Sequence, residues 1–388
     1  MVRSLGIDPG TGSFDLVLID GDRVIWERSI PTIEVARNPR VLIDAVLEAP
    51  GYDVIIGPSG YGSPVICNED IINPREYAIK ILLLTREEDI VEGFKQGDIG
   101  IMVYKAIVDA VVEFWKMNLP VCYIPSIILL PTIPRFRKFN KIDMGTADKL
   151  AVTTLAIYDQ SRRYGLDYRD VDFILVEMGY GYNAVIRVVN GVIVDAVGGT
   201  LLSPGFLTIG SIDAEIAVIG RIWTRRDVYH GGVASICGVN SIEEALEKRV
   251  IDEKCSDGFK YMFESILKNI YALISTTGVP REILLSGRLV RYSVIYDEIV
   301  RLLSNIASVR RLNGLDGAVI SKEAGQGYAL IGEGLMNGYF KKLVDHVGIR
   351  DAKGTVLDYV IHPKLTPIKA SLLDQLKSIV RKPELFTS

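Results

Sequence analysis

The stretch Leu5-Gly6-Ile7-Asp8-Pro9-Gly10-Thr11-Gly12-Ser13 joins a short apolar strand, an acid at its end and a glycine-rich bend. An alternating apolar run follows the bend at once, and this pattern predicts a β-hairpin. Glycines in the bend allow positive φ and close backbone approach, and successive N–H groups can bind an anion. Asp8 at the strand tip can hold hydrated Mg²⁺ against phosphate oxygens. Taken alone, the stretch fits a plain turn better than a phosphate site, because a tight hairpin requires the same residues.

The same pattern returns in the stretch Val176-Glu177-Met178-Gly179-Tyr180-Gly181-Tyr182. In both copies glycines lie two and four residues after the acid. A second hairpin signal follows twelve or thirteen residues after the acid, as Asp20-Gly21 and Asn190-Gly191. An internal repeat of this size predicts two similar domains, each opening with a three-strand meander whose first turn faces a common cleft.

Length and composition restrict the class of protein. A chain of 388 residues exceeds what one compact core usually holds, so two domains are expected. A net charge of −4 gives no reason to expect nucleic acid or an anionic membrane as a partner. The sequence runs into a strand after a few residues and has no apolar run of 18, which predicts neither a signal peptide nor a membrane span. A cytoplasmic protein is expected.

The cysteines and histidines give no metal or disulfide pattern. The three histidines include no H-x-x-x-H pair, so a histidine-based metal site is not expected. Rare glutamine with abundant Ile, Val, Glu and Arg is typical of a heat-adapted source. The four cysteines have no C-x-x-C spacing and predict neither a disulfide framework nor a zinc site: Cys67, Cys122, Cys237 and Cys255.

Two acids lie at the start of a predicted helix, in Ile142-Asp143-Met144-Gly145-Thr146-Ala147-Asp148-Lys149. Thr146 is an acceptable N-cap, and Asp148 falls in the first turn, where the helix dipole favours a carboxylate. Dipole stabilisation and a general base in an interdomain cleft explain Asp148 equally well. The preceding cluster with Arg135, Arg137 and Lys141 could hold an anionic substrate or form a solvated loop.

Two glycine-rich elements follow the second copy of the repeat. Ser286-Gly287-Arg288 ends a buried strand, and the backbone at Gly287 could lie flat against a base or ribose, although such a turn often needs glycine for its own sake. The helical pattern Ala324-Gly325-Gln326-Gly327-Tyr328-Ala329 has a smooth surface, which predicts that another backbone packs very close to it. The tail, residues 351–388, is expected to be an appendage with one amphipathic helix.

This order of motifs resembles the superfamily of actin, Hsp70-type chaperones, sugar kinases and acetate kinases over roughly residues 1–340. Within it the chain looks most like an archaeal family labelled as predicted butyrate kinases. The resemblance implies an α/β fold with two tandem RNase H-like, actin-like ATPase domains and a nucleotide cleft between them. The domains would be residues 1–145 and 146–345, with 346–388 as a C-terminal appendage.

The resemblance also implies ATP and Mg²⁺ as cofactors. Asp8 and Glu177 would contact the metal, and Asp8, Asp143 and Asp148 would be catalytic, the last two by orienting or deprotonating the acceptor. The residues matching the two phosphate loops, the adenosine motif and the second connecting helix would bind the nucleotide: Gly10, Thr11, Gly12, Ser13, Gly179, Tyr180, Gly181, Ser286, Gly287, Arg288 and Gly325.

The function implied is a small-molecule kinase that transfers the γ-phosphoryl group to an acceptor, with a short-chain carboxylate as one acceptor class. The alternative is an ATP-hydrolysing nucleotide switch or activator that acts on a protein partner. A carbamoyltransferase relative is disfavoured by the missing H-x-x-x-H. The second loop reads Glu177-Met178-Gly179-Tyr180 instead of the usual Asp-x-Gly-Gly/Thr, and the arginine and histidines of acetate kinases are not recognisable, so the acceptor stays open. A homodimer is one expected assembly.

Overall fold

The computed structural model describes residues 2–387, apart from the side chains of Ile99 and Arg225. Two compact units make up the chain. The first unit comprises Met1–Val171, Asn190–Asp195 and Asn313–Ser388, and the second comprises Asp172–Val189 and Ala196–Leu312. These bounds differ from the domain limits expected at 145 and 345, which stay a prediction. Helices α7 Ala147–Tyr164 and α13 Glu323–Leu335 both belong to the first unit.

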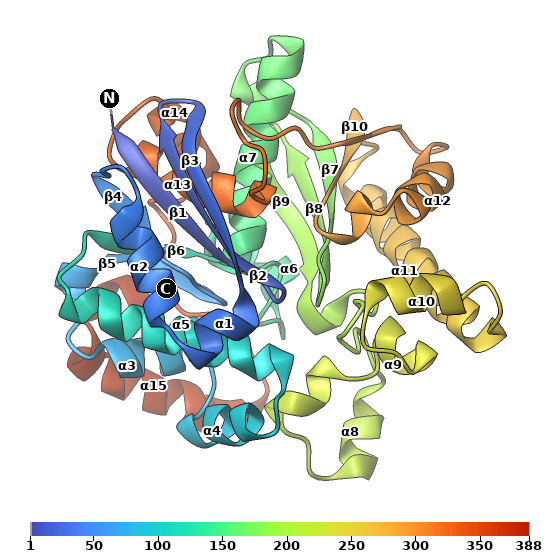
Figure 1. The fold of residues 1–388 in the computed structure, drawn as a ribbon, viewed down its shortest axis with the longest axis horizontal. Helices are drawn as coiled ribbons and strands as arrows, with labels where there is room; N and C mark the ends of the chain where they lie inside the picture. Colours follow the sequence, from blue (N-terminus) through green and yellow to red (C-terminus); the bar gives the residue numbers. More distant parts are fainter. Residues whose placement is uncertain (1, 388) are drawn as a thin grey trace. The chain divides into compact units, whose positions relative to one another are not determined.

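The first unit is built on a mixed six-stranded sheet with the order β3-β2-β1-β4-β6-β5 (Figure 1). The opening meander is antiparallel, whereas β4 runs parallel to both β1 and β6. Its strands are β1 Arg3–Pro9, β2 Ser13–Asp20, β3 Arg23–Pro31, β4 Val54–Ile56, β5 Gly62–Cys67 and β6 Val121–Pro125. Its helices are α1 Thr32–Arg37, α2 Arg40–Glu48, α3 Pro74–Glu76, the π-helix η2 Tyr77–Leu82, α4 Glu87–Lys95, α5 Ile99–Lys116, α6 Arg135–Lys138, α7 Ala147–Tyr164, α13 Glu323–Leu335, α14 Lys341–Val347 and α15 Thr366–Ile379.

The second sheet repeats the order of the first. Its order is β11-β10-β7-β8-β9, with β7 antiparallel to β8 and β10 parallel to both β7 and β11. Strands β7, β8, β9, β10 and β11 therefore correspond to β1, β2, β3, β4 and β6, which confirms the internal repeat. The strands are β7 Phe173–Met178, β8 Asn183–Val189, β9 Val192–Gly198, β10 Glu282–Ser286 and β11 Ser308–Arg311. The helices are α8 Ala214–Gly220, α9 Val233–Cys237, α10 Ile242–Lys248, α11 Glu253–Thr277 and α12 Ser293–Leu303.

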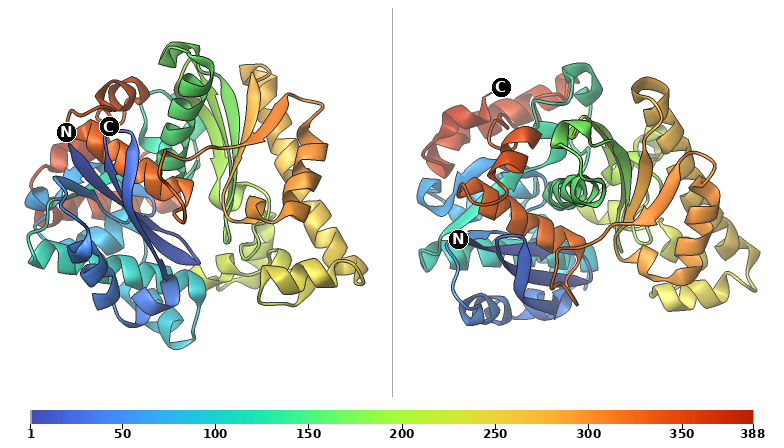
Figure 2. Two further views of the ribbon diagram at one scale, coloured as in Figure 1. Left: turned by 45° about the horizontal axis from the view of Figure 1, so that its top comes forward. Right: turned by 90° about the horizontal axis from the view of Figure 1, so that it is seen from above.

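Helix α13 packs closely against two neighbours in the first unit, as its glycines predict. A Cβ on Gly6 in β1 would lie 2.3 Å from the backbone nitrogen of Ala329, and one on Gly327 would lie 2.1 Å from the carbonyl oxygen of Ala151 in α7. Glycine is needed at these positions for close approach and not for a special φ. Figure 2 shows α13 lying across the opening strands with α7 beside it. This contact brings the residue before α13 to the first hairpin.

The C-terminal tail belongs to the core of the first unit. Leu372, Leu376 and Ile379 of α15, with Phe386 beyond it, are buried in the same hydrophobic cluster as the strands of the sheet. Gln375 accepts a hydrogen bond from Lys80 in η2. The expectation of an appendage therefore missed a segment that completes the core.

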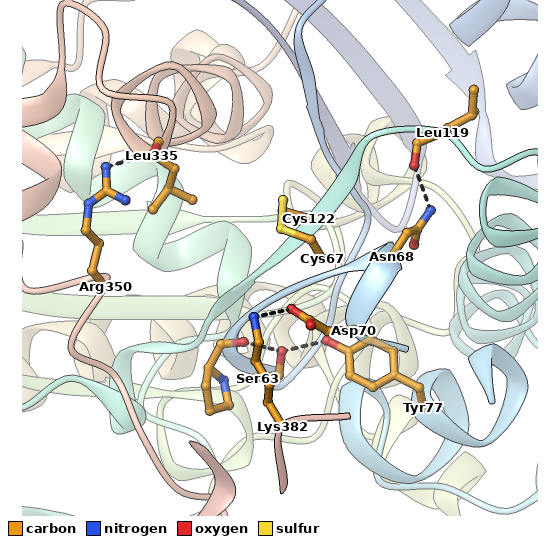
Figure 3. The surroundings of a disulfide bond; sticks show 11 residues. Ser63, Cys67, Asn68, Asp70, Tyr77, Leu119, Cys122, Leu335, Arg350 and Lys382 are labelled. Carbon is orange, nitrogen blue, oxygen red and sulfur yellow. Dashed lines mark hydrogen bonds and ion pairs between the residues drawn. A yellow bond between two sulfur atoms is a disulfide. The ribbon is translucent and has the colours of Figure 1, made fainter. Parts of the chain in front are cut away.

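The expectation that the cysteines form no disulfides is wrong. Cys67 and Cys122 are bonded, and so are Cys237 and Cys255 (Figure 3). The first pair are register partners on antiparallel β5 and β6, and the second pair joins the end of α9 to α11. Strand register and helix packing bring these cysteines together although they are far apart in the sequence. A short spacing such as C-x-x-C is therefore absent, and the sequence alone did not indicate the bonds.

No helix in the described range 2–387 is both long and apolar enough to cross a membrane.

Candidate active site

Asp8 ends the first strand opposite another acid. The antiparallel register pairs Asp8 with Asp15, so both side chains lie on one face of the hairpin. Two like charges in directly opposite positions destabilise a sheet unless something compensates them. Asp15 accepts hydrogen bonds from the hydroxyls of Ser13, at 2.9 Å, and Ser29, at 2.7 Å. These bonds fix the end of the turn to the second and third strands.

The turn itself is fixed by Thr32, at the start of α1. The Thr32 hydroxyl donates to the carbonyl of Gly10 at 2.7 Å, and its N–H donates to the carbonyl of Gly12. Neither glycine has a positive φ, contrary to one reason expected for them. Gly10 leaves needed space, because a Cβ there would lie 2.9 Å from the Ser13 carbonyl oxygen and 2.2 Å from the ammonium nitrogen of Lys322.

Lys322, the residue before α13, supplies the compensating charge. Its Nζ lies 2.5 Å from Asp8 Oδ2 and 3.9 Å from Asp15 Oδ2, and its backbone N–H donates to Asp15 Oδ2 at 2.9 Å. Burial raises the pKa of Asp8, the Lys322 charge opposes that rise, and the carboxylates of Asp148 and Asp15 add to it. The Asp8 side chain is only 4% exposed, so this ion pair is largely desolvated.

Asp148 lies in the first turn of α7 with both oxygens held. The Thr146 hydroxyl donates to Oδ1, and Lys149 Nζ lies 2.5 Å from Oδ2. Burial works against ionisation, but the Lys149 charge, the hydrogen bonds from Lys149 and Thr146, and the Lys322 charge lower the pKa of Asp148. Asp148 is thus a fixed, ionised carboxylate and a weak proton acceptor.

Asp143 has the opposite character. The Gly145 N–H donates to Asp143 Oδ1 at 2.6 Å. Burial raises the pKa of Asp143 to about 6, the Gly145 bond and the Lys149 charge oppose the rise, and the Asp148 charge adds to it. A pKa of about 6 suits Asp143 to accept a proton near neutral pH, whereas the lowered pKa of Asp148 does not.

The raised pKa of Asp143 predicts that asparagine at this position stabilises the protein at neutral pH. Because the folded-state pKa is about 6 against an ordinary 3.8, the folded state binds the extra proton, and stability falls as pH rises from about 4 to about 6. The shift of about two pH units amounts to roughly 3 kcal/mol at pH 7. Asp143→Asn keeps the acceptor for Gly145 and should remove this loss.

Urea unfolding of wild type and Asp143→Asn at pH 4 and pH 7 tests this. The wild type should lose about 3 kcal/mol more than the variant between the two pH values. The exposed Asp44→Asn in α2 is the control and should follow the wild type. Parallel pH dependence for wild type and Asp143→Asn would contradict the assignment.

In the second unit, the predicted second phosphate loop and the predicted adenosine motif lie side by side. Glu177 and Ser286 are register partners at the carboxyl ends of the parallel strands β7 and β10. Gly287 has φ +98°, and a Cβ there would lie 2.4 Å from the Met178 carbonyl and 2.7 Å from Glu177 Oε1. Glycine is therefore required at 287 both for its backbone conformation and for its closeness to Glu177. Crevices at strand carboxyl ends are the usual ligand sites of α/β sheets.

Tyr180 is part of the same grouping. Its ring lies 5.9 Å from the Arg288 guanidinium carbon and 5.2 Å from the ring centre of Phe206, and its hydroxyl donates to the Asn240 carbonyl at 3.3 Å. Burial raises the pKa of Tyr180, and the charge of Glu243 adds to the rise. Tyr180, the bulky residue of the predicted second phosphate loop, is thus held by contacts with Arg288, Phe206 and Asn240.

The structure gathers the predicted residues into two groups, one in each unit. Asp8, the turn from Gly10 to Ser13, Asp143 and Asp148 form the first group, and the remaining residues except Gly325 form the second. Gly325 packs on β2, where a Cβ would lie 3.0 Å from Val17. Its contact with a nucleotide stays a prediction, as do the roles of all the site residues.

Sequence reasoning missed the two lysines of the first group. Lys149 follows Asp148 directly, and Lys322 precedes the glycine-rich helix, so each is adjacent to a predicted motif. The basic cluster after Pro134 has structural contacts instead: Arg137 pairs with Asp195 at 3.4 Å and donates to the Val194 carbonyl. Lys138 is buried, where it donates to the Leu130 carbonyl at 2.7 Å.

The first group fits a phosphate-bound metal better than a metal held by the protein alone. Within residues 2–387, no three side chains of His, Cys, Asp or Glu are grouped as a metal site. Mg²⁺ usually needs one or two carboxylates, with phosphates and water as its other ligands. Tyr328 in α13 is buried, and its hydroxyl has no hydrogen-bond partner among these residues. Burial and the charges of Asp148 and Asp8 raise the pKa of this hydroxyl. A polar ligand bound beside these acids would give the hydroxyl the hydrogen-bond partner that buried polar groups normally have.

Comparison with known sequences gives a family and distant relatives. The profile of the family described as "Protein of unknown function (DUF1464)" matches residues 6–362. A protein named "Probable butyrate kinase" from Listeria welshimeri serovar 6b is 24% identical over 336 residues, which covers 79% of this chain and 90% of that protein. One with the same name from Listeria monocytogenes serovar 1/2a is 25% identical over 345 residues, with the same coverage.

Comparison with solved structures shows the fold. Acetate kinase from Porphyromonas gingivalis superimposes with a TM-score of 0.54 at 12% identity, covering 84% of this chain and 98% of that chain. A propionate kinase from Francisella tularensis subsp. tularensis SCHU S4 gives a TM-score of 0.54 at 13% identity, covering 85% and 98%. The expected α/β fold is confirmed.

Proposed function

Since this chain belongs to the family described as "Protein of unknown function (DUF1464)", whose description carries no activity, we propose a function from the site: ATP-dependent transfer of the γ-phosphoryl group to a small-molecule acceptor. The observation that carries the proposal is the first group, in which Asp8, Asp143 and Asp148 gather with two lysines beside the fixed turn from Gly10 to Ser13. Phosphoryl transfer depends on positioning and on charge stabilisation, and this group provides the residue types for both.

The residues of the chain would divide the work as follows. The backbone N–H groups of the turn would bind phosphate oxygens, and Asp8 would hold Mg²⁺, which supplies positive charge to the phosphates when bound. Asp148, fixed by Thr146 and Lys149, would orient the acceptor. Asp143 would accept a proton where the acceptor has one to give. In the second unit, Glu177 as a metal ligand and the Gly287 turn as an adenosine contact complete the proposal.

A short-chain carboxylate is the first acceptor to test. The relatives named butyrate kinase and the structural neighbours that are acetate and propionate kinases support this class. Because the first group carries a net negative charge, neutral hydroxyl compounds should be tested alongside the carboxylates. Four carboxylates (Asp8, Asp15, Asp143 and Asp148) face two ammonium groups, and such an excess repels an anionic acceptor unless Mg²⁺ balances it.

The direct test measures transfer of labelled phosphate from Mg-ATP to a panel of short carboxylates, sugars and polyols. Hydroxylamine trapping distinguishes an acyl phosphate from a phosphate ester. Turnover stimulated by one acceptor class supports the kinase. ATP hydrolysis that no small molecule stimulates would contradict it and favour the nucleotide switch. The cytoplasmic location and the homodimer stay predictions.

Asp148→Asn should report the acceptor class. With a hydroxyl acceptor we expect kcat to fall about 10²-fold, because the ionised carboxylate that orients the hydroxyl proton is lost. With butyrate we expect a fall of less than about tenfold, since a carboxylate has no proton to give at neutral pH. The affinity for Mg-ATP should stay unchanged in both cases, as measured by calorimetry.

Asp351→Asn, an exposed acid in the tail of the same unit, is the control for this measurement. Full activity of Asp148→Asn with every acceptor that the wild type phosphorylates would remove Asp148 from the mechanism. A loss of Mg-ATP affinity would place it in the nucleotide site instead.

A further inference from the structure

The ammonium group of Lys322 faces both the predicted metal acid, Asp8, and the predicted phosphate turn. Its Nζ is 2.5 Å from Asp8 Oδ2 and 3.4 Å from the Ser13 carbonyl, at the far end of the turn. The Cβ position of Gly10, at the near end, is 2.2 Å away. The ammonium group therefore lies across the turn, and its side chain is only 14% exposed.

Charge balance between Asp8 and Asp15 does not by itself explain this placement. Asp15 already has two hydroxyl donors, Ser13 and Ser29, and the backbone N–H of Lys322. The ammonium group lies much closer to Asp8 than to Asp15, at 2.5 Å against 3.9 Å. Its partner is thus the acid at the phosphate turn.

The backbone that carries Lys322 is held firmly. Glu27 in β3 accepts hydrogen bonds from three successive backbone N–H groups, those of Val319 and Ile320 at 2.7 Å and of Ser321 at 3.0 Å. Although burial opposes it, the hydrogen bonds from Ser321 and from these N–H groups lower the pKa of Glu27, so its carboxylate is ionised at neutral pH. The segment that leads into Lys322 is therefore held in place by Glu27. This pre-organises the Lys322 ammonium group.

The chemistry of this position suits phosphate. An ammonium group has three donors and no acceptor, and lysine binds phosphate as a point charge. We infer that Lys322 is a phosphate-binding residue, whose ammonium group contacts the β- or γ-phosphate of a nucleotide held by the turn from Gly10 to Ser13. The inference rests on the proposed function, because it requires that this turn binds a nucleoside di- or triphosphate.

A nucleotide series separates phosphate contact from a structural role. Binding of AMP, ADP and ATP to wild type and Lys322→Gln is measured by calorimetry in EDTA, so that Mg²⁺ does not mask the lysine. Loss of one charge-assisted contact should weaken ADP and ATP about 10- to 100-fold and leave AMP within about twofold. Lys322→Arg, which keeps the charge, should recover part of the lost affinity. Lys341→Gln, which removes an exposed ion pair with Asp345 in α14, should bind all three like wild type.

The outcomes are distinguishable. Equal weakening of all three nucleotides, or unchanged ADP and ATP affinity in Lys322→Gln, would overturn the inference and leave the kinase proposal standing. A wild type that binds none of them, with or without Mg²⁺, would overturn both. If Lys322→Gln does not fold, the double variant Asp8→Asn with Lys322→Gln removes both charges of the pair and is compared with Asp8→Asn alone in the same series.

Discussion

Replacing Asp8 by asparagine should lower phosphoryl transfer about 10³-fold with any acceptor. Asp8 lies at the end of β1, and in the proposed function its carboxylate would hold Mg²⁺ at the turn from Gly10 to Ser13. Removing a single pre-organised electrostatic contact costs about 10² to 10³ in rate, and a lost metal contact lies at the upper end of that range. Unlike the effect of Asp148→Asn, this loss should not depend on whether the acceptor carries a proton.

The measurement is kcat/KM for ATP at several Mg²⁺ concentrations. In Asp8→Asn the Mg²⁺ concentration that gives half-maximal activity should rise, and high Mg²⁺ should restore part of the rate. Asparagine keeps an oxygen for Lys322 but leaves its ammonium group without an anion at 2.5 Å, so thermal unfolding must be followed as well. A folded Asp8→Asn with the wild-type rate and Mg²⁺ dependence would refute the role of Asp8.

The fold could be predicted because its signals are local or periodic. The strand-acid-glycine pattern at Asp8 and its echo at Glu177 predicted two meanders, and the two sheets share one strand order. The glycines of α13 predicted a close backbone, which β1 and α7 provide. In each case a short stretch of sequence determines which elements pair. The fold could therefore be predicted from this single sequence.

The charges of the site could not be predicted in the same way. Lys322 is 314 residues from Asp8 in sequence, and only the packing of α13 on β1 brings them together. Asp143 and Asp148 looked alike as acids at a helix start, yet the pKa of one is raised and that of the other lowered. Both acids are buried, and the difference arises from the hydrogen bonds that Lys149 and Thr146 donate to Asp148 and from the Lys322 charge, which depend on the folded chain.

Breaking the Cys67–Cys122 disulfide should cost more stability than any other single change considered above. The bond closes a loop with a sequence separation of 55, and the loss of loop-closure entropy corresponds to about 4 kcal/mol. It also ties β5 to β6 beside the hydrogen bond from Asn68 to the Leu119 carbonyl and the Lys382–Asp70 ion pair, which anchors the tail (Figure 3). Cys67→Ala with Cys122→Ala should therefore loosen the sheet edge and the tail together.

The second disulfide provides the matched comparison. Cys237–Cys255 has a sequence separation of 18 and lies in the other unit, so its removal should cost about 3 kcal/mol there and leave the first unit unchanged. Urea unfolding with and without dithiothreitol measures both effects. Reductant should destabilise the wild type. In a variant whose cysteines are replaced by alanine, reductant should not destabilise the affected unit any further. Four titratable thiols in the unreduced, denatured wild type would show that neither bond exists.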